Sequence, residues 1–129
     1  SDPARRFDAV VIGEPQRAIP MLEASERDLP GDYNPPARLA VAYREMKDYG
    51  RALAASDRAL AKAYGPRRLG ILRTRARIQA ESGDRAAARA TLESTIAEAQ
   101  ALPAGQVSER TLSAIRLELA PYLTPTALP

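Results

Sequence analysis

The 129-residue chain contains no cysteine, no histidine and no tryptophan, and it has a single phenylalanine. Without cysteine it can form no disulfide, present no thiol nucleophile and bind no metal through sulfur. Without histidine it lacks the usual acid–base group near neutral pH and the commonest metal ligand. No serine can be activated by a neighbouring imidazole, and no glycine-rich phosphate loop is present. These absences argue against an enzyme and against a bound cofactor or metal.

Long apolar runs and a strong charge imbalance are missing as well. No segment is long enough to cross a bilayer, and no signal peptide is recognisable. The net charge of +3 is too small to predict a nucleic-acid-binding surface. We therefore expect a partner that is neither a membrane nor a nucleic acid. A cysteine-free chain suits both reducing and oxidising compartments, so the localisation stays open between cytoplasm and periplasm.

What the chain does contain is alanine, leucine and isoleucine at helical spacing, with few β-branched or aromatic residues. This pattern predicts an all-α fold of about seven helices. A first helix is expected to start at Asp2-Pro3, with Phe7, Val10 and Val11 on its apolar stripe. The others are expected over residues 15–29, 35–47, 50–64, 66–82, 84–101 and 108–119.

The helix ends carry recognisable signals. Asn34, Asp84 and Ser108 are expected to cap helix N-termini, because their side-chain oxygens can accept a bond from an unpaired backbone N–H. Pro121 is expected to end the last helix, since proline lacks that N–H. Met46 is expected to face inward at the end of the helix over 35–47.

A near-repetition runs through the sequence. The segment Lys47-Asp48-Tyr49-Gly50-Arg51-Ala52-Leu53 has counterparts at residues 13–19 and 82–88. The equivalent alanines, Ala18, Ala52 and Ala88, are spaced by 34 and then 36 residues. A repeat of this length is typical of stacked helix pairs, in which no unit buries its apolar side alone. The two extra residues are expected in a lengthened turn around residues 65–68.

The residues over 33–64 resemble a tetratricopeptide repeat (TPR), a 34-residue pair of antiparallel helices. The matching positions are Leu39, Ala40, Tyr43, Ala52, Ala59 and Leu60, with Asp48-Tyr49 at the inter-helix turn. The next unit keeps Gly83, Asp84 and Ala88 but departs from the family pattern at Arg75, Gln79 and Thr95.

The resemblance implies a single TPR-like domain over residues 1–121. Its repeat units would cover about 1–30, 33–66 and 67–102. A C-terminal capping helix would follow over 107–120, with Glu109, Arg110 and Glu118 facing outward as a polar cap. Residues 122–129 would form a tail. The chain starts near the middle of a repeat, so we expect a fragment of a longer protein.

The resemblance also implies a protein–protein interaction or scaffold module that binds a peptide or partner protein in a concave groove. By analogy with the family, the groove-lining residues would be Arg38, Arg44, Glu45, Arg73 and Arg77. Guanidinium groups bind carboxylates in bidentate fashion, so the implied partner is an acidic protein segment or a C-terminus. The alternative interpretation is a solvated face in which the arginines pair locally with Glu45 and Glu81, which is the commoner role of charged helix faces.

Two other functions remain open. The segment over 32–40 is similar to TPR regions appended to thioredoxin-like domains of bacterial proteins, which would make the chain an accessory domain of a redox protein. The second possible function is that of a purely structural repeat that associates with itself, so the oligomeric state stays open.

The run Arg67-Arg68 with the arginines after it could contact RNA, but no aromatic residue is interleaved, which favours a scattered arginine face.

Overall fold

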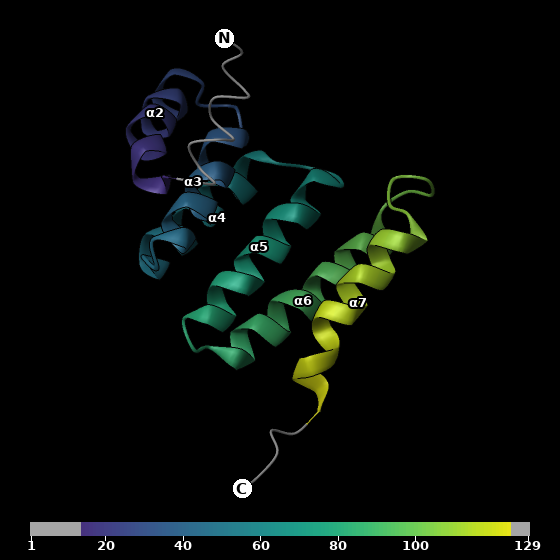
Figure 1. Cartoon of the computed structure of the whole chain (residues 1–129). Helices are drawn as coiled ribbons and strands as arrows, with labels where there is room; N and C mark the ends of the chain where they lie inside the picture. Colours follow the sequence, from purple (N-terminus) through teal and green to yellow (C-terminus); the bar gives the residue numbers. More distant parts are fainter. Residues whose placement is uncertain (1–13, 125–129) are drawn as a thin grey trace, which may run out of the picture. The chain divides into compact units, whose positions relative to one another are not determined.

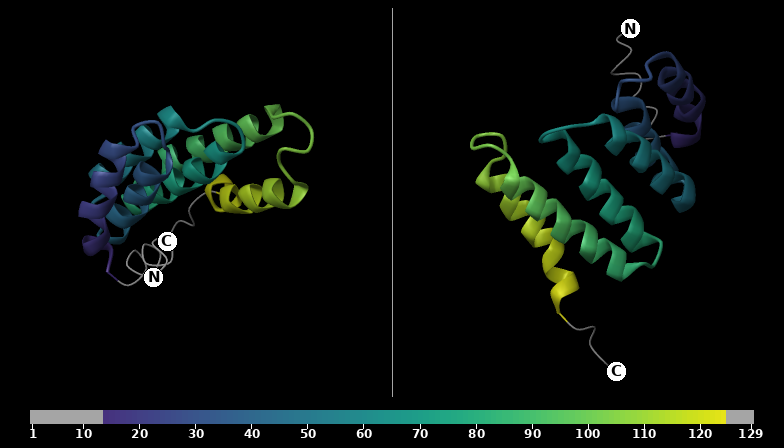
Figure 2. Two further views of the ribbon diagram at one scale, coloured as in Figure 1. Left: turned by 90° about the horizontal axis from the view of Figure 1, so that it is seen from above. Right: turned by 180° about the vertical axis from the view of Figure 1, so that it is seen from behind.

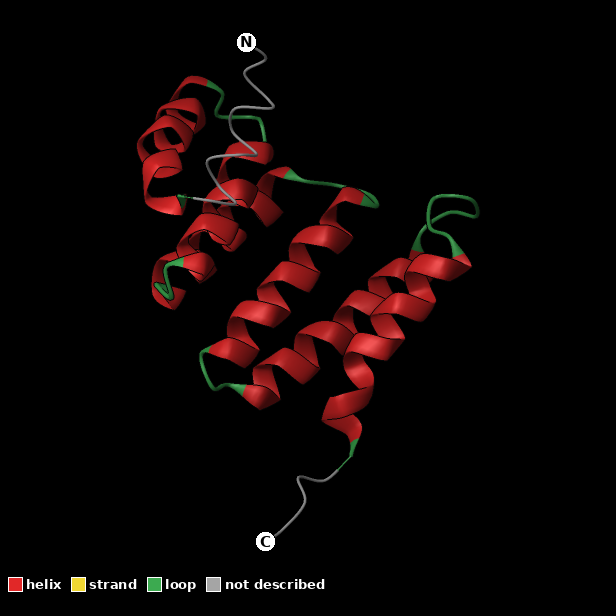
Figure 3. Ribbon diagram, in the orientation of Figure 1, coloured by secondary structure: helices red, strands yellow, loops and turns green. Residues whose placement is uncertain are grey.

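The computed structural model describes residues 14–124, which form helices and no strand (Figures 1 and 3). The predicted all-α class is therefore confirmed for this part of the chain. The predicted helix at Asp2-Pro3 and the residues after Thr124 lie outside the described range. The helices are Pro15–Asp28 (α2), Asn34–Glu45 (α3), Tyr49–Lys62 (α4), Arg67–Glu81 (α5), Arg85–Ala101 (α6) and Glu109–Leu123 (α7).

The chain divides into two compact units, with the boundary between Ala63 and Tyr64. In the N-terminal unit, α3 packs against both α2 and α4. In the C-terminal unit, α6 packs against both α5 and α7, and both views in Figure 2 show α6 and α7 side by side. Among residues 14–124, each unit therefore contains three successive helices joined by short connections.

Alanine occupies the most closely packed positions of the helices. Ala18, Ala52, Ala59 and Ala88 are all 0% exposed. A side chain of one carbon lets two helix backbones approach closely where a larger residue would hold them apart. The equivalent alanines Ala18, Ala52 and Ala88 are thus all buried, and Ala55 is also 0% exposed.

The turn between α3 and α4 and the turn between α5 and α6 have the same geometry, 36 residues apart. Lys47 (φ 61°) and Gly83 (φ 95°) both adopt the left-handed conformation. The next residues, Asp48 and Asp84, each donate their N–H to a carbonyl five residues earlier, at 2.9 Å in both turns. Their side chains accept a bond from the N–H three residues later, at 3.3 and 3.1 Å. The predicted capping role of Asp84 is confirmed, and the sequence repeat is a repeat of backbone structure.

The α5–α6 pair is longer than the α3–α4 pair. The helices α3 and α5 start at 34 and 67, a step of 33, but end at 45 and 81, a step of 36. Likewise α6 has 17 residues where α4 has 14. The added residues, 67–69 and 99–101, lie at the same end of an antiparallel pair. The expected lengthened turn is therefore wrong, because the connection over 63–66 is shorter than that over 29–33 and the helices carry the insertion.

Both ends of α3 differ from the sequence prediction. Asn34 does not act as the cap, because Asp32 accepts hydrogen bonds from both its backbone N–H (2.8 Å) and its side-chain amide (2.9 Å). A carboxylate two residues upstream thus replaces the expected cap. At the other end, Met46 lies in the turn after Glu45 and is 44% exposed, so its predicted inward position is wrong.

The last helix continues past Pro121, which was expected to end it, and runs to Leu123. Its N-terminus is as predicted, because Ser108 accepts a bond from the N–H of Thr111 at 3.1 Å. At its C-terminus, Arg85 donates to the carbonyl of Pro121, and Arg89 donates to the carbonyl of Tyr122 at 3.4 Å. The last carbonyls of a helix have no intrahelical partner, and these two arginines of α6 supply one. Both bonds lie in the turn of α7 that follows the proline.

Candidate functional site

Two arginines of the C-terminal unit, Arg73 and Arg77, lie four residues apart on α5 and both contact Glu118 of α7. The Nε of Arg73 donates to both carboxylate oxygens of Glu118, at 3.1 and 3.0 Å, and its Nη2 also contacts Oε2. The Nη2 of Arg77 lies 3.6 Å from the same Oε2. One carboxylate therefore neutralises part of the charge of two guanidinium groups.

The pairing of Arg73 with Glu118 is partly shielded from water. The side chains of Arg73 and Glu118 are 25% and 26% exposed, whereas Arg77 is 46% exposed. The hydrogen bonds that Arg73 donates to Glu118 raise the pKa of Arg73 above its usual value, against the opposing effect of burial. Arg73 is thus the anchored member of the pair, and Arg77 is the member more open to solvent.

A pocket of about 130 Å³ opens beside these charges, and its walls come from all three helices of the C-terminal unit. Its lining residues are Arg73, Ala76, Arg77, Leu92, Glu118 and Tyr122. Ala76 and Leu92 belong to a buried cluster that also includes Ile115 and Leu119, and Tyr122 packs against that cluster. The pocket therefore combines an apolar floor with a charged rim, the usual composition of a small binding site.

A third guanidinium lies next to this pocket. The guanidinium carbon of Arg85 is 4.8 Å from the centre of the Tyr122 ring, within the range of a cation–π contact. The same side chain donates to the carbonyl of Pro121. Arg85 thus contacts the tyrosine that lines the pocket and brings a third positive charge near it.

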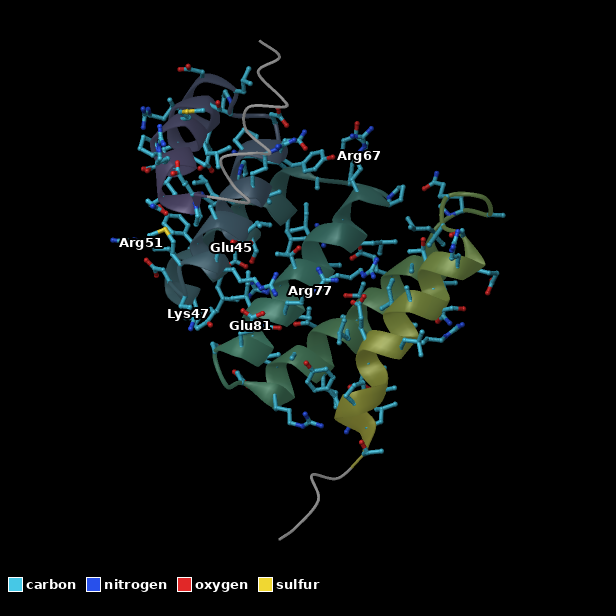
Figure 4. All side chains as sticks on the ribbon, viewed as in Figure 1. Glu45, Lys47, Arg51, Arg67, Arg77 and Glu81 are labelled. Atoms are coloured by element: carbon cyan, nitrogen blue, oxygen red, sulfur yellow. The ribbon has the colours of Figure 1, made fainter. Side chains whose placement is uncertain are left out.

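The structure places the predicted site residues in both units. Arg73 and Arg77 meet at Glu118, which confirms that they share a helix face. Arg38, Arg44 and Glu45 all lie on α3 in the N-terminal unit. The two arginines there are half-buried, whereas Glu45 is exposed at the C-terminal end of α3 (Figure 4). Convergence of Arg44 with the α5 arginines stays a prediction.

Glu118 is the residue of this candidate site that the sequence interpretation misplaced. We expected it to face outward as part of a polar cap, together with Glu109 and Arg110, and only those two are exposed. Glu118 follows Ile115 by three residues and precedes Leu119, so it borders the buried stripe of α7. That position was a signal that its side chain reaches the neighbouring helices.

A second charged cluster lies in the N-terminal unit and was not predicted. Arg58 of α4 binds Glu26 of α2 through two hydrogen bonds, at 2.7 and 3.2 Å, and Lys62 lies 3.7 Å from the same carboxylate. The hydrogen bond from Arg58 is the main cause that lowers the pKa of Glu26, with a further contribution from Lys62. An open depression of about 330 Å³ lies beside this cluster and is also lined by Glu23, Arg27 and Tyr43. Its charges are closely balanced, so it has no clear preference for a ligand of either sign.

No family model, curated protein or solved structure matches this chain. Within residues 14–124, none of the helices combines the length and the apolar character that a bilayer-spanning segment requires.

Proposed function

We propose that this chain is a TPR-like module that binds an acidic segment of a partner protein, and that it is not an enzyme. The observation that carries the proposal is the repeated turn, in which Lys47-Asp48 and Gly83-Asp84 have the same conformation and hydrogen bonds. The buried alanines Ala52 and Ala88 follow these turns at equivalent positions. Stacked helix pairs of this kind generally expose an extended surface on which other chains bind.

The pocket of the C-terminal unit supports an acidic partner. Arg73 and Arg77 present guanidinium groups from successive turns of one helix, a spacing at which both can contact one carboxylate. Guanidinium–carboxylate contacts are directional and bidentate, so they orient a ligand as well as attract it. The apolar floor at Ala76 and Leu92 adds contact area next to the charges. Because helices hold these residues in place, little conformational entropy is lost when a peptide binds.

The proposal can be tested by selecting peptides from a random display library against the folded chain. We expect the selected peptides to be rich in Asp and Glu, since the pocket rim carries two arginines against one glutamate. The selected peptides are then bound to the triple variant R73E/R77E/E118R. This variant inverts the charge of the rim and keeps oppositely charged partners in contact, so the helices stay paired. We expect a loss of affinity of about tenfold or more from the inverted rim.

Circular dichroism of the triple variant provides the structural control, because its helicity should equal that of the natural chain. Selected peptides without acidic enrichment would contradict the acidic partner. Equal affinity for the natural chain and the folded triple variant would show that peptides bind elsewhere and would remove Arg73 and Arg77 from the site.

A further inference from the structure

We propose that Glu118 is a built-in competitor at the Arg73–Arg77 site, where its carboxylate holds the place that an acidic side chain of the partner would take. Binding would then require the Glu118 side chain to leave the two arginines. This inference rests on the proposed function and adds a regulation of the same site. It follows from the contacts of Glu118 with two arginines of α5, a helix of its own unit.

The contacts of Glu118 are those expected of a bound acidic ligand. Both of its oxygens accept bonds from Arg73, and one of them also lies 3.6 Å from Arg77. Arg73 bonds through Nε and Nη2, the edge of the guanidinium that fits a carboxylate best. A ligand carboxylate would use the same edge, so Glu118 and the ligand cannot both occupy it.

The site can also accommodate an acidic side chain of a ligand in place of the Glu118 carboxylate. The pocket of about 130 Å³ has room for roughly four waters at about 30 Å³ each, which corresponds to one acidic side chain. Of its lining residues, only Glu118 is acidic. When Glu118 leaves, Arg73 and Arg77 still line the pocket, and Arg85 contacts the ring of Tyr122. The charge there favours an acidic occupant.

Glu118 can leave without unfolding α7. Its side chain is 26% exposed, and α7 is held to α6 by Leu112, Ile115 and Leu119, which are independent of the carboxylate. Both side chains are partly exposed, so water can replace the contacts of each charge when the carboxylate leaves. A ligand therefore binds only to molecules from which the Glu118 carboxylate has left. Its apparent dissociation constant equals the intrinsic constant divided by the fraction of such molecules.

The test uses the full chain and a fluorescein-labelled, C-terminally amidated hexaglutamate peptide, so that only side-chain carboxylates can bind. Fluorescence anisotropy gives the dissociation constant for the natural chain, for E118Q and for E93Q. Glu93 pairs with Arg89 at 3.1 Å on the exposed face of α6, so E93Q makes the same change in net charge and breaks an Arg–Glu pair outside the pocket. We expect E118Q to bind about five- to tenfold more tightly than the natural chain and E93Q to bind less than twofold more tightly.

The NMR signals of the Arg73 and Arg77 Nε–H groups locate the binding. In E118Q they should shift on addition of hexaglutamate and stay unchanged with hexaglutamine. Equal affinities of the natural chain and E118Q would overturn the competition by Glu118 and leave the proposed function standing. Failure of folded E118Q to bind hexaglutamate would overturn the competition as well, while the proposed function is decided separately by the library selection. If E118Q loses helicity, E118D replaces it, because it keeps the charge and draws the carboxylate back by one methylene.

Discussion

Thr91 of α6 donates a 2.6 Å hydrogen bond to Oε1 of Gln79 on α5. Gln79 is only 9% exposed, and the equivalent positions of the other helix pair, 36 residues earlier, are Tyr43 and Ala55. The polar residue that departs from the repeat pattern on α5 is thus matched by a polar residue on the helix it packs against. A buried amide oxygen without such a partner would be costly.

Replacing Thr91 by valine should therefore destabilise the chain by about 1–3 kcal/mol, because Gln79 loses its donor while the side-chain volume is kept. The double variant T91V/Q79M should recover most of that loss, since neither residue then has a polar group to satisfy. Urea unfolding followed by circular dichroism measures both effects. S94A, an exposed change on the same helix, is the control and should stay within about 0.5 kcal/mol of the natural chain. A T91V variant as stable as S94A would contradict the prediction.

Lys47 and Gly83 provide a reciprocal test of the turn geometry. Both have positive φ, which is unfavourable for lysine and unrestricted for glycine. We expect K47G to stabilise the chain by about 0.5–1 kcal/mol, because the relief of backbone strain outweighs the added freedom of the unfolded chain. G83K should destabilise it by about 1 kcal/mol for the same reason. Thermal unfolding measures the two shifts, and shifts of the same sign would contradict the shared left-handed geometry.

The ion pair between Glu26 and Arg58 makes part of the stability depend on pH. Arg58 lowers the pKa of Glu26 below its usual value of 4.5, so the folded chain binds this proton less tightly than the unfolded chain. The contribution is therefore complete above about pH 4.5 and is lost as the pH falls through the pKa of the folded state. Because Arg58 is 45% exposed, we expect only about 0.5–1 kcal/mol.

The measurement compares the unfolding free energies of the natural chain and E26Q at pH 7 and pH 3. The difference between them should be present at pH 7 and disappear at pH 3. D28N removes a carboxylate from the exposed end of the same helix and serves as the control, with an effect below about 0.5 kcal/mol. A difference that persists at pH 3 would show that packing of the Glu26 side chain, and not its charge, is responsible.

The last turn of α7 should depend on Arg85. Removing this side chain takes away a donor to the Pro121 carbonyl and the cation–π contact with Tyr122. We expect R85A to speed amide hydrogen exchange at Tyr122 and Leu123 about fivefold, corresponding to roughly 1 kcal/mol of local stability. R116A, an exposed change on α7 itself, should leave these amides unchanged. Equal exchange in R85A and the natural chain would show that α7 persists past Pro121 without this support.

Local sequence signals predicted most of the described fold. The helices from α2 to α6 begin and end within two residues of their expected bounds, because alanine spacing and capping aspartates are short-range signals. Ser108 and Asp84 cap as expected for the same reason. Pro121 was misinterpreted because its effect depends on Arg85 and Arg89, which precede it by more than 30 residues.

The candidate site was predictable only in part. The shared face of Arg73 and Arg77 follows from their spacing within one helix, which the sequence shows directly. Their common partner does not, because Glu118 is 45 residues from Arg73 and reaches it only once α7 packs against α6. The Glu26–Arg58 pair was missed for a related reason, since it connects two residues that are 32 positions apart on different helices. A position beside a buried stripe can indicate that a side chain reaches a neighbouring helix, but the identity of its partner is set only when the unit packs.

The extra helical turn of the α5–α6 pair also provides packing contacts for α7. Leu69 and Ala99 lie within the two added segments, and together with Leu112 of α7 they form a buried cluster that Leu102 and Val107 also contact. Arg68, in the same added turn, holds Glu98 at 2.9 Å. The added residues thus form the apolar surface against which the first turn of α7 packs. Shortening α5 and α6 to the lengths of α3 and α4 would preserve the repeat but remove the residues against which α7 packs.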